Sequence, residues 1–295
     1  MDGNRTSHCD DRNHDGACIA VSFCHRSVTC LLFWMFLLVA PGLSITAHAT
    51  GETHPQSPET ADIIDLVSLE WPPYSGEELA GKGLASIVVK GAFAYGHRAA
   101  RVHIMPWRRA LQEIRDESGM VQGIFPIYDD PARRDRFLLS DPFAYSPLGF
   151  VYHRGHDFDW HTLDDLKGLL IGVVGDYANE AQFDEMTANG QIQTLQANDD
   201  ITLLRLLDAG RIDVAVMDQL VASHILETQP EFAENRRWFR FHPRYLDYKS
   251  LHVGFHKTDR GEILRNAFNS GLKWLNCQDN DCQNSWPYGP EYQRF

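Results

Sequence analysis

The sequence alternates between short apolar runs, which predict strands, and longer segments with apolar residues three or four positions apart, which predict helices. The runs expected to be strands are 63–69, 102–105, 121–127, 148–152, 169–174, 192–195, 214–218, 238–241 and 251–255, with a further crossing segment at 245–250. The segments expected to be helices are 83–95, 107–115, 199–209, 219–226 and 260–275, and one more helix is expected to begin just after 175–179. This alternation predicts an α/β protein with a largely parallel sheet covered by helices.

The segment 121–145, VQGIFPIYDDPARRDRFLLSDPFAY, carries the first candidate chemistry. Its apolar run is followed by a turn expected at 129–131 and then by Arg133 and Arg134. An arginine just after a buried strand lies where open α/β sheets bind ligands, and its planar guanidinium suits a carboxylate. The alternative for any Arg-Arg pair is a charged surface turn.

A second set of motifs follows later in the chain. LDDLKG precedes the run 169–174, and Gly175-Asp176-Tyr177 follows it. Free N–H groups at a helix start can hold an anion, but Asp176 would repel a carboxylate and is better interpreted as a helix N-cap. Gly-Arg-Ile-Asp leads into the run that ends at Asp218, whose carboxylate can cap the next helix and still face a cleft.

These motifs resemble those of bacterial extracellular solute-binding proteins of the amino-acid-binding type (family 3). The resemblance rests on a Pro-Pro-aromatic turn after the first strand, on Pro-x-Arg followed by Ser-Asp-Pro, on Leu-Lys-Gly before a strand, and on Gly-Arg-x-Asp before an apolar run and Asp. It covers about 63–275. It implies a type II periplasmic binding protein fold, with two lobes that are each a mixed, mostly parallel sheet flanked by helices.

The resemblance also implies a division of the chain. Lobe 1 is expected at 63–152 and 251–275, and lobe 2 at 153–250, with crossing segments near 148–154 and 245–252. The remaining parts are a signal peptide with an extended n-region at 1–49, a flexible leader at 50–62, and a tail with a disulfide loop at 276–295.

In this family the residue matched by Arg133 grips the α-carboxylate of the ligand, and the residue matched by Asp218 pairs with the α-ammonium. The aromatic residue of the Pro-Pro turn forms a wall of the site, here Trp71 or Tyr74, although Trp71 is equally well interpreted as a plug of the core. The family usually has Ser-Gly-Thr where this chain has Gly-Asp-Tyr. The expected ligand contacts are Arg133, Asp218, Tyr74, Trp71, Tyr128, Gly175, Asp176 and Tyr177, with no catalytic residue, metal or cofactor.

The N-terminal segment predicts export. The apolar run 31–45 is short for a membrane span and is followed by Ala47-His48-Ala49, a cleavage pattern. We therefore expect a periplasmic protein cleaved near Ala49, with an uncleaved anchor as the alternative. Cys277 and Cys282 would then remain in the mature chain, where a local disulfide is favoured over a zinc site.

Composition and charge exclude some partners. The net charge of −13 lacks the basic footprint of a nucleic-acid-binding protein. Histidine pairs such as His153 with His156 and His252 with His256 lack a metalloprotease pattern, and they are interpreted as structural or solvated. The resemblance implies a monomer that delivers a small ligand to the membrane subunits of an ABC transporter. Two alternatives stay open: a periplasmic enzyme of the same fold, such as a cyclohexadienyl dehydratase, and a ligand-sensing partner of a membrane receptor.

Overall fold

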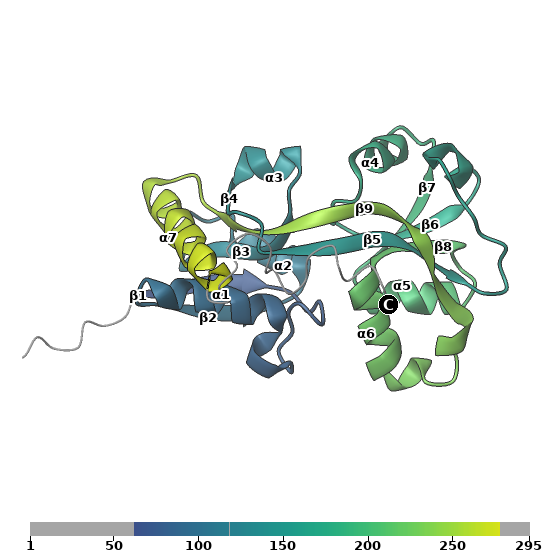
Figure 1. Ribbon diagram of the computed structural model, residues 1–295. Helices are drawn as coiled ribbons and strands as arrows, with labels where there is room; N and C mark the ends of the chain where they lie inside the picture. Colours follow the sequence, from purple (N-terminus) through teal and green to yellow (C-terminus); the bar gives the residue numbers. More distant parts are fainter. Residues whose placement is uncertain (1–61, 118, 278–295) are drawn as a thin grey trace, which may run out of the picture. The chain divides into compact units, whose positions relative to one another are not determined.

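The computed structural model describes residues 62–117 and 119–277, all within one compact unit (Figure 1). Its strands are β1 (Asp62–Ser68), β2 (Arg98–Ile104), β3 (Val121–Tyr128), β4 (Leu138–Leu139), β5 (Ala144–His153), β6 (Leu170–Val174), β7 (Gln193–Ala197), β8 (Val214–Asp218) and β9 (Phe239–Phe255). Its helices are α1 (Leu84–Tyr95), α2 (Trp107–Glu113), α3 (Pro131–Arg136), α4 (Ala181–Ala188), α5 (Asp200–Asp208), α6 (Gln219–Thr228) and α7 (Asp259–Asn276). The predicted α/β class is confirmed, and most predicted elements agree with the structure to within a few residues.

The described strands form one sheet in the order β2-β1-β3-β9-β5-β8-β6-β7, with β4 also pairing with β9. The strands β2, β1 and β3 are parallel to one another, as are β7, β6 and β8. Between these two groups lie β9 and β5, which are antiparallel to each other and to their outer neighbours. We call β1–β4 with α1, α2, α3 and α7 lobe 1, and β6–β8 with α4, α5 and α6 lobe 2.

The long strands β5 and β9 run side by side from lobe 1 to lobe 2 (Figure 1). We expected three separate segments over 238–255, but the structure has a single strand of 17 residues there. The pairing of β9 with β3 and β4 near one end and with β5 along much of its length explains its continuity, because ladder partners satisfy its backbone groups. The residue boundaries predicted for the two lobes stay a prediction.

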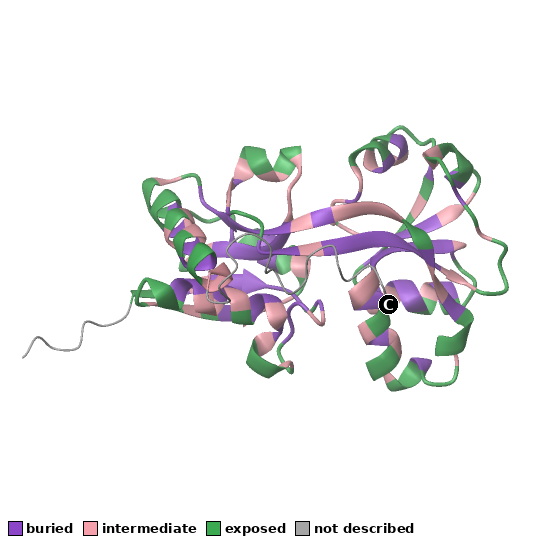
Figure 2. Cartoon of the chain, in the orientation of Figure 1, coloured by how far each residue is buried: buried purple, intermediate pink, exposed green. Residues whose placement is uncertain are grey.

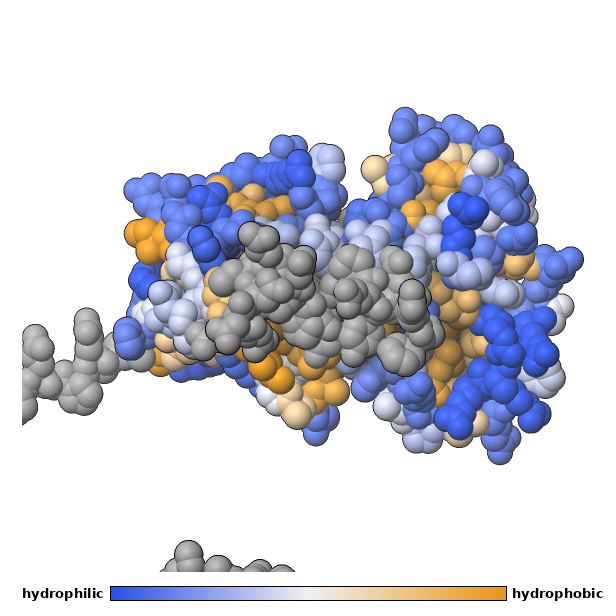
Figure 3. Space-filling view, viewed as in Figure 1, coloured by the Kyte–Doolittle hydropathy of each residue, from blue (hydrophilic) through white to orange (hydrophobic). Residues whose placement is uncertain are grey.

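Buried residues run along much of β5 and alternate with exposed ones along the helices (Figure 2), and most of the buried residues are hydrophobic. Large aromatic residues fill both lobes, among them Phe93 and Phe268 in lobe 1 and Phe183 in lobe 2. The visible face outside the grey atoms is mostly hydrophilic, with smaller hydrophobic areas (Figure 3). Within the described residues, no helix is both long and apolar enough to cross a membrane.

Several predicted features concern residues outside 62–117 and 119–277. They are the signal peptide, its cleavage near Ala49, the flexible leader before Asp62, and most of the tail at 276–295. The disulfide stays a prediction, because Cys282 also lies outside the described residues.

Candidate functional site

Arg133 is positioned by a short helix where the sequence predicted only a turn. Pro131 is favourable at the first helical position because it has no N–H to satisfy, and the Asp130 side chain accepts the N–H of Arg133 at 3.0 Å. The resulting helix α3 begins three residues after β3 ends, so it carries Arg133 at the carboxyl end of that strand. The side chain of Arg133 is only 16% exposed.

The neighbouring Arg134 has a different environment. Its side chain is 67% exposed, and its guanidinium pairs in a bidentate manner with Asp129. This exposed pairing makes Arg134 a matched control for Arg133.

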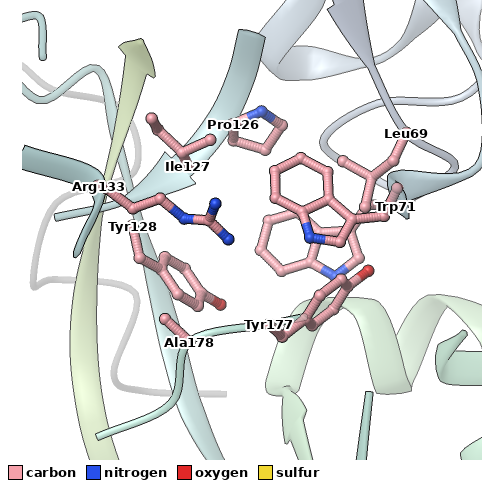
Figure 4. A pocket seen from close by; sticks show the side chains of 9 residues that line it. Leu69, Trp71, Pro126, Ile127, Tyr128, Arg133, Tyr177 and Ala178 are labelled. Atoms are coloured by element: carbon pink, nitrogen blue, oxygen red, sulfur yellow. The ribbon is translucent and has the colours of Figure 1, made fainter. Parts of the chain in front are cut away.

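Arg133 faces a small cavity between the lobes. Lobe 1 contributes Leu69, Trp71, Trp107, Pro126, Ile127, Tyr128 and Arg133, and lobe 2 contributes Tyr177 and Ala178. Figure 4 shows Arg133, Trp71 and Tyr177 pointing toward the same space. The cavity measures about 30 Å³, which is room for a few water molecules and less than an amino acid needs.

Aromatic rings surround the Arg133 guanidinium. Its Cζ lies 5.5 Å from the centroid of the Trp107 ring, within cation–π range. Trp107 in turn contacts Tyr177 edge to face across the cleft, at 6.1 Å between ring centroids. Trp71 stacks on Tyr74 at 4.5 Å and is 4% exposed, so it both lines the cavity and fills the core.

Trp107 was not among the ligand contacts expected from the sequence, where it only began the predicted helix 107–115. One signal could have found it: Trp107 begins α2 three residues after β2 ends, at the carboxyl end of a strand parallel to β1. The missed residue Arg108 lies beside it and, like Trp107 and Tyr177, borders a neighbouring open groove of about 590 Å³.

Asp218 is buried rather than open to the cavity. It is 1% exposed, and its Oδ1 accepts the backbone N–H of Val221, which confirms the predicted N-cap of α6. Its Oδ2 accepts hydrogen bonds from the Tyr74 hydroxyl at 3.0 Å and the Ser146 hydroxyl at 2.6 Å. The Ser146 hydroxyl has one proton and donates it to Asp218. The Tyr128 hydroxyl is therefore the donor in its hydrogen bond with Ser146, at 2.7 Å.

The Asp218 carboxyl group has a raised pKa, and its burial is the main cause. Burial raises the pKa of Asp218 to about 6, although hydrogen bonds from Ser146, Val221 and Tyr74 oppose the shift. Burial, followed by the charge of Asp218, raises the pKa of the Tyr74 and Tyr128 hydroxyls well above their ordinary range. Both tyrosines therefore keep their protons and act as hydrogen-bond donors.

In the loop after β6, considered above as a possible anion site, two backbone N–H groups already have partners. The N–H of Gly175 donates to Ala197 at 2.9 Å, and the N–H of Tyr177 donates to Val174 at 3.3 Å. The next helix, α4, has Glu180 as its N-cap, so the interpretation of Asp176 as the N-cap is wrong. The Glu180 carboxylate accepts the N–H groups of Gln182 and Phe183, where an external anion would otherwise bind.

Asp176 instead contacts lobe 1. Its carboxylate accepts a hydrogen bond from Arg108 Nε at 3.0 Å, and its backbone carbonyl accepts bonds from Arg133 at 3.0 Å and Trp107 Nε1 at 3.1 Å.

Of the expected ligand contacts, the structure gathers Trp71, Tyr128, Arg133 and Tyr177 around one cavity. It places Asp218 and Tyr74 in the hydrogen-bonded network beside it, Gly175 at the groove, and Asp176 across the cleft opposite Arg133.

No group of three or more His, Cys, Asp or Glu residues that could hold a metal ion occurs in 62–117 or 119–277. The histidines near the lobe 1 end of β9 are structural. A ring nitrogen of His252 forms a hydrogen bond with the backbone oxygen of Ser140 at 2.7 Å, and one of His256 forms a hydrogen bond with that of Val121 at 3.1 Å.

No protein-family model matches this sequence. The L-cystine-binding protein TcyJ of Escherichia coli (strain K12) is 22% identical over 205 residues, which are 69% of this chain and 76% of that protein. An ancestral arginine-binding protein bound to arginine has a TM-score of 0.61 and 17% identity, covering 74% of this chain and 93% of that one. A histidine kinase sensor domain with similarity to periplasmic binding proteins has a TM-score of 0.64 and 17% identity, covering 75% and 92%. The two-lobed fold is thereby confirmed.

Proposed function

We infer that this chain is an amino-acid-type solute-binding protein of family 3, and we propose that it captures a small polar ligand between its lobes. The ligand is an amino acid or a related carboxylate, and an ABC transporter receives it. The names of similar proteins support this proposal, since TcyJ binds L-cystine and the ancestral protein binds arginine.

The observation that carries the proposal is the position of Arg133. A largely buried guanidinium lies at the carboxyl end of β3, among aromatic rings from both lobes. A buried cation needs a partner, and the guanidinium geometry matches a carboxylate. The nearest acidic side chain of lobe 1, Asp130, is 3.8 Å from Arg133 Nε. The hydrogen bond that a terminal nitrogen of Arg133 donates goes to the neutral backbone carbonyl of Asp176, so the described contacts show no carboxylate hydrogen-bonded to this guanidinium.

A ligand of amino-acid size requires the cleft to open, because the present cavity holds only a few water molecules. We propose that the lobes separate about β5 and β9, that the ligand binds Arg133 first, and that closure follows. An α-ammonium would reach Asp218 only by replacing the hydroxyl of Tyr74 or Ser146 at Oδ2.

A thermal-shift screen of amino acids and small carboxylates tests this function, because a ligand that binds only the folded protein raises its melting temperature. Calorimetry with the best ligand then compares the parent with Arg133→Ala and Arg133→Lys. We expect Arg133→Ala to lose about 2–5 kcal/mol of binding free energy. Arg133→Lys should also bind more weakly, because an ammonium cannot form the bidentate fork.

The matched control is Arg134→Ala, which removes an exposed guanidinium one residue away and should bind like the parent. If Arg133→Ala folds normally and binds as tightly as the parent, the carboxylate site is wrong. Asp218→Asn separates ligand classes: unchanged binding in this variant would indicate a ligand without an α-ammonium.

A second candidate function is supported by the two buried carboxyl groups near the cleft, Asp218 and Asp200, whose pKa values are raised to about 6 and about 7. A carboxyl group that titrates near neutral pH can act as a general acid. Incubation of the pure protein with prephenate-type substrates distinguishes an enzyme from a binding protein. Turnover that disappears in Asp218→Asn or Asp200→Asn would favour the enzyme.

A further inference from the structure

Three donors of lobe 1 converge on one residue of lobe 2. Arg108 contacts the carboxylate of Asp176, while Arg133 and Trp107 share its backbone carbonyl, all at 3.0 to 3.1 Å. Arg108 and Trp107 come from the start of α2 and Arg133 from α3. These three contacts join segments 43 to 69 residues apart in the sequence and cross the cleft that the proposed ligand must enter.

The backbone of Asp176 has a left-handed conformation, with φ of 64°. Residues with a side chain rarely adopt it, and Asp and Asn tolerate it best after glycine. The loop is therefore built so that the peptide carbonyl and the carboxylate of one residue both reach lobe 1. A residue that only had to connect β6 to α4 would not need these two acceptors.

Asp176 also uses the donors that a ligand would use. One terminal nitrogen of Arg133 donates to its carbonyl, and the remaining space beside Arg133 is too small for an amino acid. A carboxylate that enters the cleft must therefore compete with Asp176 for Arg133, and it meets the Asp176 carboxylate nearby.

We propose that Asp176 is an internal ligand: a tethered acceptor that holds the lobes closed over Arg133 and that an anionic ligand must displace. Closure by the tether follows from the three contacts alone. Competition with ligand rests on the proposed function, because it requires Arg133 to be the carboxylate site.

The solvent exposure of the Arg108–Asp176 ion pair limits how strongly it can change ligand affinity. The side chains of Arg108 and Asp176 are 71% and 47% exposed, and an exposed ion pair of this kind changes an equilibrium by about fivefold or less. The apparent affinity of a ligand is its intrinsic affinity multiplied by the fraction of protein in which Asp176 has left Arg133 free. Removing the ion pair should therefore tighten ligand binding by up to about fivefold.

Small-angle scattering of the purified protein, with nothing added, tests the tether. Asp176→Asn keeps the backbone conformation accessible and removes the charge, and Arg108→Gln removes its partner. We expect both variants to have a larger radius of gyration than the parent at low salt, and the double variant to open no further than either one. The parent should expand toward the same value as sodium chloride screens the pair.

The matched control is Arg109→Gln, because Arg109 is the next residue of α2 and its guanidinium pairs with Glu113 of the same helix. It should scatter like the parent. Asp176→Asn and Arg108→Gln that scatter like the parent would overturn the tether, and so would additive opening in the double variant.

Sodium acetate, as a minimal carboxylate probe in thermal-shift titrations, tests the competition. We expect half-saturation at an up to fivefold lower acetate concentration in Asp176→Asn than in the parent, and no response in Arg133→Ala. Equal acetate responses in the parent and Asp176→Asn would overturn the competition. Opened variants in which acetate has no effect would support the tether but contradict the competition and the proposed carboxylate site.

Discussion

Two carboxyl groups at the cleft side of lobe 2 are buried without a cationic side chain as a hydrogen-bond partner among the described contacts. Asp218 accepts hydrogen bonds from the hydroxyls of Tyr74 and Ser146. Asp200, which is 5% exposed, accepts a hydrogen bond from the Tyr177 hydroxyl at 3.3 Å. Burial first, and the charge of Asp218 second, raise the pKa of Asp200 to about 7. Such groups make the stability of the protein depend on pH near neutrality.

The sign of this dependence follows from the pKa values. Both carboxyl groups have folded-state pKa values above the ordinary value of 3.8, so the folded protein binds these protons more tightly than the unfolded chain. Their contribution to the free energy of unfolding therefore rises as pH falls from 8 through 7 and 6, and it levels off near pH 4. The free energy of unfolding should therefore increase between pH 8 and pH 5, and we expect this increase to be smaller by roughly 2 kcal/mol in Asp200→Asn than in the parent.

Urea unfolding at several pH values measures this change. Asp164→Asn is the control, since it removes an exposed carboxylate, with 73% of its side chain accessible, from the same lobe. A pH dependence in Asp200→Asn that is as steep as in the parent would show that Asp200 does not cause it.

At the scale of elements, the packing of α1 against α7 in lobe 1 depends on one glycine. A Cβ at Gly271 of α7 would collide with the backbone carbonyl of Ala92 of α1, and that backbone cannot rotate away as a side chain can. At Gly91, one residue earlier in α1, a Cβ would lie 3.4 Å from a methyl group of Leu275, an ordinary contact.

These two glycines predict opposite effects of the same substitution. Gly271→Ala should lower the free energy of unfolding by about 1–3 kcal/mol, because the helices must separate. Gly91→Ala should raise it by about 0.5–1 kcal/mol, because alanine favours the helix more than glycine does. Chemical denaturation of both variants tests this, and destabilisation by Gly91→Ala as large as that by Gly271→Ala would contradict the packing argument.

At the scale of the whole molecule, the proposed function requires export. We propose that the chain is cleaved near Ala49 and released into the periplasm. Mass spectrometry of periplasmic protein should then find a mature N-terminus at or near Thr50. Protein that stays in the membrane fraction and retains 31–45 would refute the proposed location.

The fold class and the order of most elements could be predicted from local sequence patterns, because hydrophobic periodicity and capping residues act over a few neighbouring positions. Asp218 illustrates this: its N-cap position was evident from a strand-like run followed by a helical one, and the structure confirms it. The short helix α3 was missed because a Pro-containing turn and a Pro-started helical turn look alike in sequence.

The groups that meet across the cleft could be identified only from the folded chain. The contacts of Asp176 with Arg108, Trp107 and Arg133, and the hydroxyls that enclose Asp218, join residues 43 to 144 positions apart. No local pattern encodes such pairs, since they form where the loops of lobe 1 and lobe 2 approach each other along β5 and β9. The physical reason is that secondary structure depends on near neighbours, whereas burial and charge pairing in a cleft depend on how the whole chain packs.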